Sequence, residues 1–249
     1  MIIPAKASST RLPGKNLKLF CGHPLVAWSI VQGVYAKCID EVWVSTDSDE
    51  IRRVAEWYGA KVMMRNYVDE VDTSGTVPVQ EFINRQLESG GLAMDDILAT
   101  RLCTTPGLKP DDIDNMWARF QWMKEHYDAE GIGMRHERRT AIFNRKVVDG
   151  VCREIGVDAM CHNSGLIVES LAALSFNTVK NSIPGQMSAD EEEHIRLNLG
   201  EYPHSYYYNV EKWQWHDVDT LEEFEIAELE TEYFLLKGRD MLEVYKGTK

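Results

Sequence analysis

The sequence predicts an α/β fold with a mostly parallel sheet that helices cover on both faces. Short apolar segments rich in β-branched residues alternate with longer segments in which apolar residues recur every three or four positions. This alternation is typical of buried strands separated by amphipathic helices. It runs from residue 1 to about residue 126, and each helix must carry the chain back across the sheet, so the strands are expected to be parallel.

The first half of the chain supplies the elements of this sheet in order. "MIIPA" is short, apolar and β-branched, and it opens a series of expected strands at residues 1–5, 41–46, 60–64 and 96–102. The expected helices lie between and after these strands, at residues 24–36, 48–58, 78–88 and 110–126. Asp47 is expected either to cap the second helix or to approach a ligand site from the end of its strand. Gly59 is expected to end this helix, and Pro110 to begin the fourth.

The alternation breaks between about residues 127 and 190. "TAIFNRKV" (140–147) and "SGLIVES" (164–170) have the pattern of strands in an antiparallel excursion, a kind of insertion often used for substrate closure or dimer contacts. The chain then returns with an expected helix at 220–236. No linker separates these parts, so we expect a single domain over 1–249, with 130–190 as a substrate-closing or dimerisation subregion.

Composition argues against several classes of protein. The chain has 249 residues, 44% hydrophobic and 27% charged, with a formal net charge of -13, which disfavours binding along a nucleic-acid backbone. No apolar run approaches the length of a membrane span, and no signal-type apolar region follows Met1. Five scattered cysteines without zinc-type spacing indicate reduced thiols, so we expect a cytoplasmic protein with neither nucleic-acid nor membrane partners.

The loop after the first strand carries cations that stand out in so acidic a chain. They are Lys6, Arg11 and Lys15. Backbone amides together with Lys and Arg side chains are a common means of holding polyphosphate. A Walker A loop is excluded because Ser9 stands where its first Gly belongs and Asn16 where its hydroxyl belongs. The residues alone leave two interpretations open, a phosphate-binding loop or a solvated basic turn.

A second candidate feature is the pair of carboxylates in "DVD" (217–219). We expect this segment to leave a strand, where Asp217 and Asp219 would point the same way and could bind one Mg²⁺ with water and phosphate oxygens. Such pairs also cap helices, and Asp219 comes just before the expected helix at 220–236. Metal binding and capping both remain open from the residues alone.

Several segments, in order along the chain, resemble the sugar-activating cytidylyltransferases, which make CMP-linked acidic sugars. They are "IIPAKASSTRLPGKNL" (2–17), "VWVSTDSDEIRRVAEWYGAKV" (42–62), "DTSGTVPVQEFI" (72–83), "TTPGLKPDDID" (104–114), "NSGLIVES" (163–170) and "HDVDTLEEFEIAELE" (216–230). The resemblance implies a Rossmann-like nucleotidyltransferase fold that couples CTP to an acidic, sialic acid-like 2-keto-3-deoxy sugar with release of pyrophosphate. It also implies Mg²⁺ as cofactor and a homodimer formed through residues 130–190.

The resemblance assigns roles to the residues that match the family. Lys15 and Arg11 are implied to be catalytic, with Lys15 on the α and β phosphates. Nucleotide binding is implied or expected for Lys6, Ala7, Ser8, Arg11, Lys15, Asn16, Arg65 and Thr76. Asp217 and Asp219 match the acids that bind the metal.

The chain departs from the family at several positions. Leu102 replaces a Gln of the sialate branch, Gly75 stands where that branch has a nucleotide-contacting Ser, and Lys109 comes nearest to its Arg. Thr104 occupies the place of a metal-binding Asp in the octulosonate branch. Three alternatives therefore stay open: a 3-deoxy-manno-octulosonate-type substrate, a glycosyltransferase that uses a nucleotide sugar, and a nucleotide-binding protein without turnover.

Overall fold

Strands and helices alternate through the first half of the chain, as the sequence predicts. The structure, a computed structural model, describes residues 1–9, 11–65, 76–93, 96–127, 131–148, 151–170 and 205–247. The first strands are β1 (Ile2–Pro4), β4 (Trp43–Thr46), β5 (Lys61–Met64) and β6 (Ile97–Arg101). The helices that follow are α1 (Leu25–Tyr35), α2 (Asp49–Trp57), α3 (Thr76–Ser89) and α4 (Pro110–Tyr127). Between β1 and α1 lie η1 (Lys15–Leu17), a short 3-10 helix, and a hairpin of β2 (Leu19–Phe20) and β3 (His23–Pro24).

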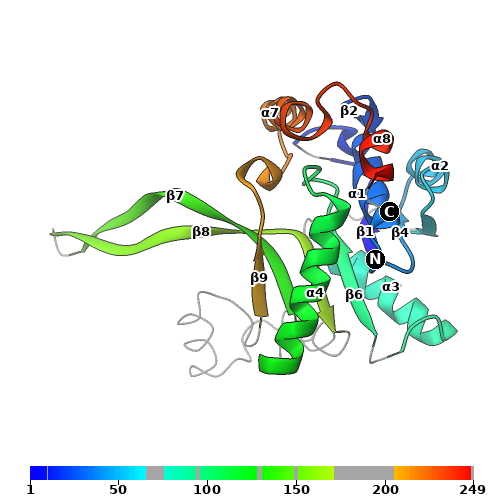
Figure 1. The fold of residues 1–249 in the computed structure, drawn as a ribbon, viewed down its shortest axis with the longest axis horizontal. Coiled ribbons are helices and arrows are strands. Elements are labelled where there is room, and N and C mark those ends of the chain that lie inside the picture. The colour runs from blue at the N-terminus through cyan, green and yellow to red at the C-terminus, as the bar shows by residue number, and fades with distance from the viewer. Residues whose placement is uncertain are drawn as a thin grey trace.

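The described strands form a seven-stranded sheet in the order β5-β4-β1-β6-β8-β7-β9 and a separate two-stranded hairpin (Figure 1). β1 pairs in parallel with both β4 and β6, and β4 pairs in parallel with β5. Two long strands follow, β7 (Gly131–Val148) and β8 (Val151–Ser170), and then β9 (Ser205–Asn209). β8 is antiparallel to β6 and to β7, whereas β9 is parallel to β7. The predicted mostly parallel α/β fold is therefore confirmed.

Helices cover both faces of the parallel part of the sheet. Ile2 and Ile3 are neighbours in β1, so their side chains point to opposite faces, and both are fully buried. Ile3 packs in a cluster with side chains from α1, α2 and α4, whereas Ile2 packs in another cluster with Phe82 and Ile83 of α3. The sheet is thus enclosed between helical layers, which explains why its strands are apolar throughout.

The C-terminal helices pack on the outer side of α1. They are α7 (Leu221–Thr231), the π-helical turn η3 (Glu232–Leu236) and α8 (Met241–Lys246). Phe224 of α7 and Tyr245 of α8 join Phe20 and Trp28 in a third apolar cluster. Because α1 is covered by the sheet on one side and by these helices on the other, residues 25–33 are buried without interruption.

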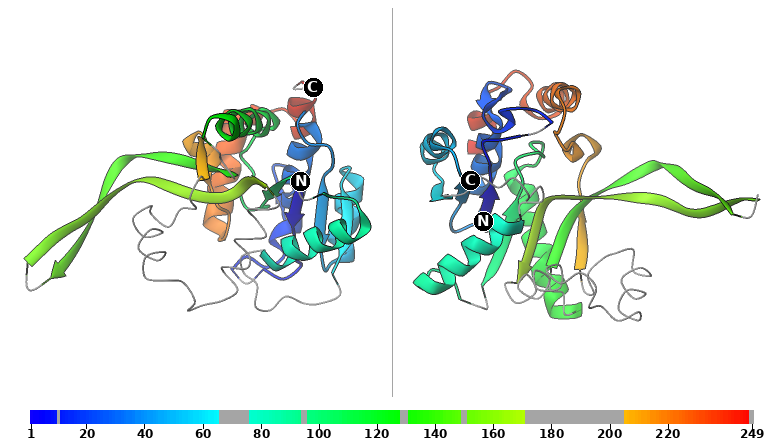
Figure 2. Two further views of the ribbon diagram at one scale, coloured as in Figure 1. Left: turned by 90° about the horizontal axis from the view of Figure 1, so that it is seen from below. Right: turned by 180° about the vertical axis from the view of Figure 1, so that it is seen from behind.

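The antiparallel excursion is confirmed, but it is longer than predicted. The expected strands at 140–147 and 164–170 lie inside β7 and β8, which pair with each other through several register shifts. The two strands form a hairpin that projects far from the body of the molecule (Figures 1 and 2). The sequence pattern marked only the more apolar parts because backbone pairing carries the strands on through the polar residues between them. A role of this hairpin in dimer formation remains a prediction.

Two further expectations need correction. The helix expected at 220–236 is α7, and it changes at residue 232 into the π-helical turn, which ends at Lys237 with a left-handed backbone (φ 52). The segment 217–219 does not leave a strand, because the 3-10 helix η2 (Lys212–Trp215) lies between it and β9. Within the described ranges, no helix is both long enough and apolar enough to cross a membrane.

Candidate active site

Loops from four distant parts of the chain meet at the carboxyl ends of the parallel strands. The backbone N–H of Ala7, after β1, donates to Oδ1 of Asp47, after β4, at 2.8 Å. The backbone N–H of Val218 donates to the carbonyl of Thr104, after β6, at 2.7 Å. Lys15 connects the two pairs, because its Nζ donates to the carbonyl of Val218 at 2.8 Å. These loops therefore converge at one edge of the sheet.

The loop after β1 folds back on itself. Gly14 has a left-handed backbone (φ 67) that few other residues adopt without strain, and it precedes η1. The buried side chain of Asn16 donates from Nδ2 to the carbonyl of Lys6 at 2.9 Å, which ties the end of the loop to its beginning. The loop therefore presents Ala7 and Ser8 at the surface and turns Lys15 inward.

Asp219 contacts two of the three cations that the sequence singled out. Its Oδ1 lies 2.8 Å from Nζ of Lys15, and its Oδ2 lies 2.7 Å from Nη2 of Arg11. The Lys15 side chain is only 10% exposed, whereas that of Arg11 is 69% exposed. One cation is therefore fixed within the protein, and the other reaches the same carboxylate from solvent.

Asp217 lies beside this charged cluster with a more open carboxylate. Partial desolvation by the protein around it and the negative charge of Asp219 raise the pKa of Asp217, against opposing effects of a hydrogen bond from the Thr104 hydroxyl and of the charge of Lys15. The residue is nevertheless exposed at the surface. The negative charge of Asp219 thus acts on Asp217, while binding of one metal ion by the two acids remains a prediction.

Helix capping does not explain either of the aspartates that precede a helix. The side chain of Thr220, not Asp219, accepts the N–H of Glu223 at the start of α7, and Glu223 returns a bond to the N–H of Thr220. Ser48, not Asp47, accepts the N–H of Ile51 at the start of α2. The prediction that Asp47 caps this helix is wrong, and so is the interpretation of Asp219 as a cap. A hydroxyl residue one position later is the cap in both helices, which leaves both carboxylates to the site.

Arg65 follows β5 and carries a buried guanidinium. Its backbone N–H donates to the carbonyl of Thr46 at 2.8 Å, and the residue is 5% exposed. Among the residues that the structure describes, neither Nε nor Nη2 of Arg65 has a hydrogen-bond partner. A buried guanidinium strongly favours acceptors for its donors, so this side chain is suited to an anionic or oxygen-rich ligand.

The remaining predicted residues are placed only in part. Lys6 is half-buried and lies in the loop after β1, where its carbonyl is the acceptor for Asn16. Thr76 is the first residue of α3, but its side chain lies outside the described part. Gly75 lies outside the described residues as well. Thr104 was noted in the sequence only as a replacement, yet its carbonyl and hydroxyl both contact the 217–219 segment, a role that no pattern in the sequence signals.

The donor set at "DVD" fits a hard divalent cation. In the described ranges no three His, Cys, Asp or Glu side chains form a ready-made metal cluster. Two neighbouring carboxylates that leave further positions to water and phosphate oxygens match the usual environment of Mg²⁺. Asp217 is the more available ligand, since each oxygen of Asp219 already forms an ion pair with a cation.

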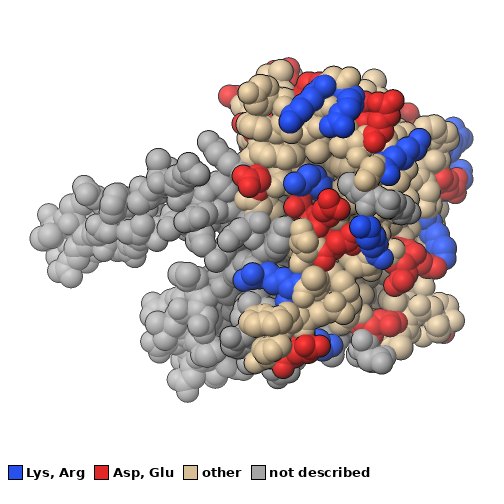
Figure 3. Space-filling model, viewed as in Figure 1, with Lys and Arg blue, Asp and Glu red and all other residues tan. Residues whose placement is uncertain are grey.

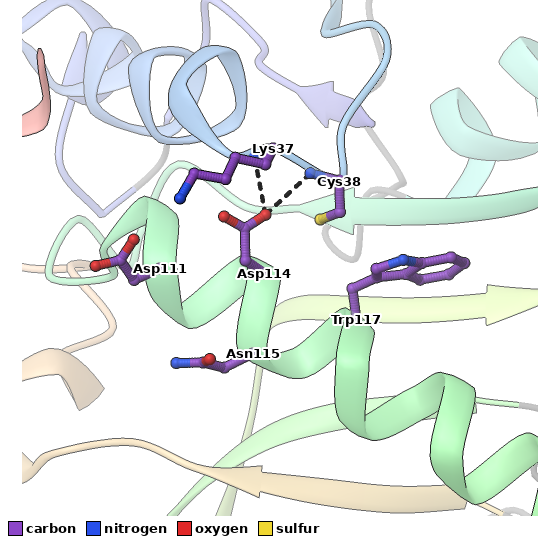
Figure 4. A pocket seen from close by; sticks show the side chains of 6 residues that line it. All are labelled: Lys37, Cys38, Asp111, Asp114, Asn115 and Trp117. Atoms are coloured by element: carbon purple, nitrogen blue, oxygen red, sulfur yellow. Dashed lines mark hydrogen bonds between the residues drawn. The ribbon is translucent and has the colours of Figure 1, made fainter. Parts of the chain in front are cut away.

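A cavity of about 530 Å³ lies elsewhere, beside the C-terminal end of α1 (Figure 4). Asp114 on its wall accepts the backbone N–H groups of Lys37 and Cys38 at 2.8 and 2.9 Å. The carboxylate thereby fixes the turn that follows α1. The loop at residues 5–17 precedes the opposite end of this helix, so the cavity is separate from the candidate site.

Fold and site together define a class of protein. A cation-bearing loop after the first strand and a carboxylate pair, both at the carboxyl end of a parallel sheet, form an arrangement suited to binding a nucleotide. The chain belongs to the cytidylyltransferase family, which matches residues 1–159.

Curated relatives agree with this family. The chain is 38% identical over 113 residues to CMP-N,N'-diacetyllegionaminic acid synthase of Legionella pneumophila, covering 45% of this chain and 48% of the relative. It is 37% identical over 114 residues to N-acylneuraminate cytidylyltransferase B of Danio rerio, covering 45% and 25%. It is 30% identical over 149 residues to 3-deoxy-manno-octulosonate cytidylyltransferase of Thermodesulfovibrio yellowstonii, covering 59% and 56%. The matched region thus spans about half or less of these relatives.

Solved structures extend the likeness of the fold to almost the whole chain. A CMP:2-keto-3-deoxy-manno-octonic acid synthetase in complex with CTP superposes with a TM-score of 0.61 at 21% identity, covering 92% of this chain and 95% of that one. A 4-diphosphocytidyl-2C-methyl-D-erythritol synthase gives a TM-score of 0.60 at 11% identity, covering 92% and 96%. At these identities the comparison shows a shared fold, which agrees with the sheet and helices described above.

Proposed function

We propose that the protein transfers CMP from CTP to an acidic, sialic acid-like 2-keto-3-deoxy sugar. The contacts of Lys15 and Arg11 with Asp219, next to Asp217, carry the proposal. This arrangement puts two phosphate-binding cations and two potential metal ligands within one small volume. Membership of the cytidylyltransferase family and the names of the relatives support the choice of CTP and of an acidic sugar.

In the proposed reaction, a hydroxyl oxygen of the sugar attacks the α-phosphorus of CTP. A new phosphorus–oxygen bond forms while the hydroxyl releases its proton to water, the bond to the β-phosphate bridging oxygen breaks, and pyrophosphate leaves. The main obstacle is charge, since an anionic sugar must approach a polyanion. Lys15, Arg11 and Lys6 would neutralise the phosphates, and the buried position of Lys15 makes its charge more effective than it would be in water.

We propose Mg²⁺ as the cofactor, held by Asp217 and Asp219. The ion would neutralise phosphate charge and favour departure of pyrophosphate. Asp219 binds Lys15 and Arg11 in the structure, so it must release at least part of this contact to become a metal ligand. The two cations would exchange the carboxylate for phosphate oxygens, and metal and nucleotide binding would therefore reinforce each other.

This exchange can be tested without turnover. Mn²⁺, used as a probe for Mg²⁺, should bind the protein weakly alone and at least about 5-fold more tightly with a non-hydrolysable CTP analogue, within the usual range of coupling. Titration of free Mn²⁺ by its paramagnetic resonance signal gives both constants. Equal affinity in the two states would contradict the exchange.

The other nucleotide contacts are assigned by position. Ala7 and Ser8 are exposed on the loop, and the Ser8 amide can donate to a phosphate oxygen. The Ala7 amide donates to Asp47 in the structure, so it would have to exchange this carboxylate for a phosphate oxygen. The unpartnered nitrogen atoms of Arg65 are proposed to bind the nucleotide, and the same role is proposed for Thr76 at the start of α3. Asn16 is proposed to act on the nucleotide through the loop that it closes as well as by direct contact.

The sugar and nucleotide can be identified by one set of assays. Each of four nucleoside triphosphates is combined with several 2-keto-3-deoxy acids, sialic acid-type and octulosonate-type, in the presence of Mg²⁺, and pyrophosphate is measured. The proposal expects pyrophosphate only with CTP and with a sialic acid-like acid. Pyrophosphate release with an octulosonate-type acid instead would show that the substrate is of the octulosonate type. If no pair of nucleotide and sugar acid released pyrophosphate, the proposed transfer would be contradicted.

We also propose that the protein acts as a homodimer in the cytoplasm. The hairpin of β7 and β8 projects from the body. Within the described ranges its outer part pairs only within the hairpin, and isolated two-stranded ribbons are marginally stable in water. The described cysteines Cys21, Cys38 and Cys103 are free thiols, which supports a reducing compartment. Sedimentation of the intact protein and of a variant with a shortened hairpin tests the dimer.

A further inference from the structure

The loop between β6 and α4, residues 102–109, is unusual because the rest of the molecule holds its backbone in place. Connecting loops normally lie on the surface, but residues 105–108 are buried. Six of its carbonyls accept hydrogen bonds from other parts of the chain. The carbonyl of Leu102 accepts from Ser29 and Arg101, that of Thr104 from Val218, and that of Thr105 from Arg101. The carbonyls of Pro106, Gly107 and Leu108 accept from Gln32, Gln214 and Tyr245, in that order. Donors from β6, α1, η2, α8 and the 217–219 segment therefore fix one short loop.

Arg101 lies at the centre of this set of donors. It is the last residue of β6 and is fully buried, and desolvation lowers the pKa of its guanidinium to about 10. Nη1 donates to the carbonyl of Leu102 at 3.0 Å and to the Thr105 hydroxyl, and Nη2 donates to the carbonyl of Thr105. A buried charge is tolerated where such bonds compensate its lost hydration, so the guanidinium and the loop depend on each other.

Gln32 and Tyr245 extend the network to two helices. Nη2 of Arg101 donates to Oε1 of Gln32 at 2.8 Å, and Nε2 of Gln32 donates to the carbonyl of Pro106 at 2.6 Å. The Tyr245 hydroxyl donates to the carbonyl of Leu108 at 3.0 Å. Gln32 and Tyr245 are fully or almost fully buried, and their side chains also approach each other at 3.4 Å.

The first part of the 102–109 loop reaches the candidate active site through Thr104. The carbonyl of Thr104 accepts the N–H of Val218, and its hydroxyl donates to the carboxylate of Asp217. The carbonyl of Val218 in turn accepts from Lys15. A shift of the loop would therefore move Lys15 and Asp217 together.

We propose that Arg101, Gln32 and Tyr245 are positioning residues for the transfer reaction. They act through the 102–109 loop, which holds the segment 217–219 at the distance from Lys15 that the reaction needs. The expected effect on kcat rests on the proposed function, whereas the expected effect on the position of the 217–219 segment does not. Displacements of about 1 Å can lower rates about 100-fold, so a fixed loop has a direct catalytic value.

The test compares Tyr245→Phe with Tyr58→Phe in the full chain. Each change removes one hydroxyl from a tyrosine that bonds across the fold, but the Tyr58 hydroxyl bonds to Nδ1 of His23 at 2.7 Å and not to the loop. Tyr245→Phe should lower kcat about 10-fold with an unchanged KM for CTP, since the site is misplaced rather than lost. Tyr58→Phe should leave kcat unchanged at a similar loss of melting temperature.

A second measurement separates this inference from the proposed function. Hydrogen exchange of the Val218 amide, which donates to Thr104, should be faster in Tyr245→Phe than in the unaltered protein and unchanged in Tyr58→Phe. If the protein proves inactive on every sugar but the amide responds in this way, the proposed function fails and the coupling stands. The inference would be overturned if the Val218 amide exchanged its hydrogen at the same rate in both variants, or if an active protein had the same kcat in both.

Gln32→Glu provides a check that does not depend on the tyrosine. This change keeps the size of the side chain and the acceptor for Arg101 but removes the Nε2 donor to Pro106. It should lower kcat at a constant KM, as Tyr245→Phe does. A fall in kcat matched by an equal fall in CTP affinity would point to a general loss of structure and contradict a positioning role.

Discussion

The loops at residues 5–17 and 102–109 reach the same pair of carboxylates, but they are built in opposite ways. In the first loop, the Asn16 side chain bonds back to the carbonyl of Lys6, Ala7 and Ser8 stay at the surface, and the exposed side chain of Arg11 reaches Asp219 from solvent. The second loop is largely buried, and side chains from distant elements hold its carbonyls. The first is suited to receive a ligand, whereas the second is suited to keep its position while the ligand changes.

Among the changes that test this difference between the loops, Lys15→Ala in the first loop should have the largest effect on kcat. Removing a cation that stabilises a developing phosphate charge should lower kcat about 10²–10³-fold. The fold should survive, since the loss is confined to contacts with Val218 and Asp219. Pyrophosphate release and thermal melting measure the two effects. Lys18→Ala is the matched control, because Lys18 is exposed nearby and lies over the ring of Phe224; a fully active Lys15→Ala would refute the catalytic assignment.

Gly107→Ala should disturb the second loop through its backbone. A Cβ at this position would lie 2.8 Å from Cα of Gln214, a backbone atom that cannot turn aside. We expect a lower melting temperature and up to about 100-fold lower kcat, because the loop and the 217–219 segment must shift. Gly247→Ala is the control, since its Cβ would meet only ordinary contact at 3.7 Å. Unchanged kcat in Gly107→Ala would mean that the second loop need not be fixed.

Asp219→Asn addresses the point where both loops meet. It removes one carboxylate charge from the proposed metal site, so the Mg²⁺ concentration for half-maximal rate should rise at least about 10-fold, the effect typical of losing even an outer-shell group. Rates at several Mg²⁺ concentrations measure this shift. An unchanged Mg²⁺ requirement would show that Asp219 serves only Lys15 and Arg11.

Thr220→Ala should have the smallest effect. Thr220 caps α7 through Glu223, so its loss should cost about 1 kcal/mol of stability. The Mg²⁺ requirement should stay the same because the hydroxyl belongs to the helix and not to the site. Melting curves and Mg²⁺ titrations of both Thr220→Ala and Asp219→Asn measure the two effects. A raised Mg²⁺ requirement in Thr220→Ala, or a loss of stability alone in Asp219→Asn, would contradict the assignment of capping to Thr220 and metal binding to Asp219.

The sequence predicted the first loop better than the second. Lys6, Arg11 and Lys15 are close in sequence, so their charge and spacing were visible before any fold was known. The contact between Lys15 and Asp219 spans 204 residues, and the sequence could only mark each partner separately. The second loop depends on Arg101, whose burial and hydrogen bonds come from packing; in the sequence it looks like any surface arginine.

Helix starts were misplaced by a single residue for a related reason. Asp47-Ser48 and Asp219-Thr220 each offer two residue types that cap helices, so composition alone does not choose between them. The sequence could have identified Thr220 as the cap, since Glu223 three positions later completes a capping box. At Ser48 the choice depended on the contact of Asp47 with Ala7, which only the fold reveals.

The bond from Tyr245 to Leu108 also has a consequence for synthesis. The parallel strands β1, β4, β5 and β6 precede residue 127, and with the first helices they can begin to fold as the chain leaves the ribosome. The loop that supports Asp217 cannot be fixed until α8 has emerged and docked against α1. A nascent chain that already shows the fold would therefore still lack an ordered site, and activity would appear only with the last helix.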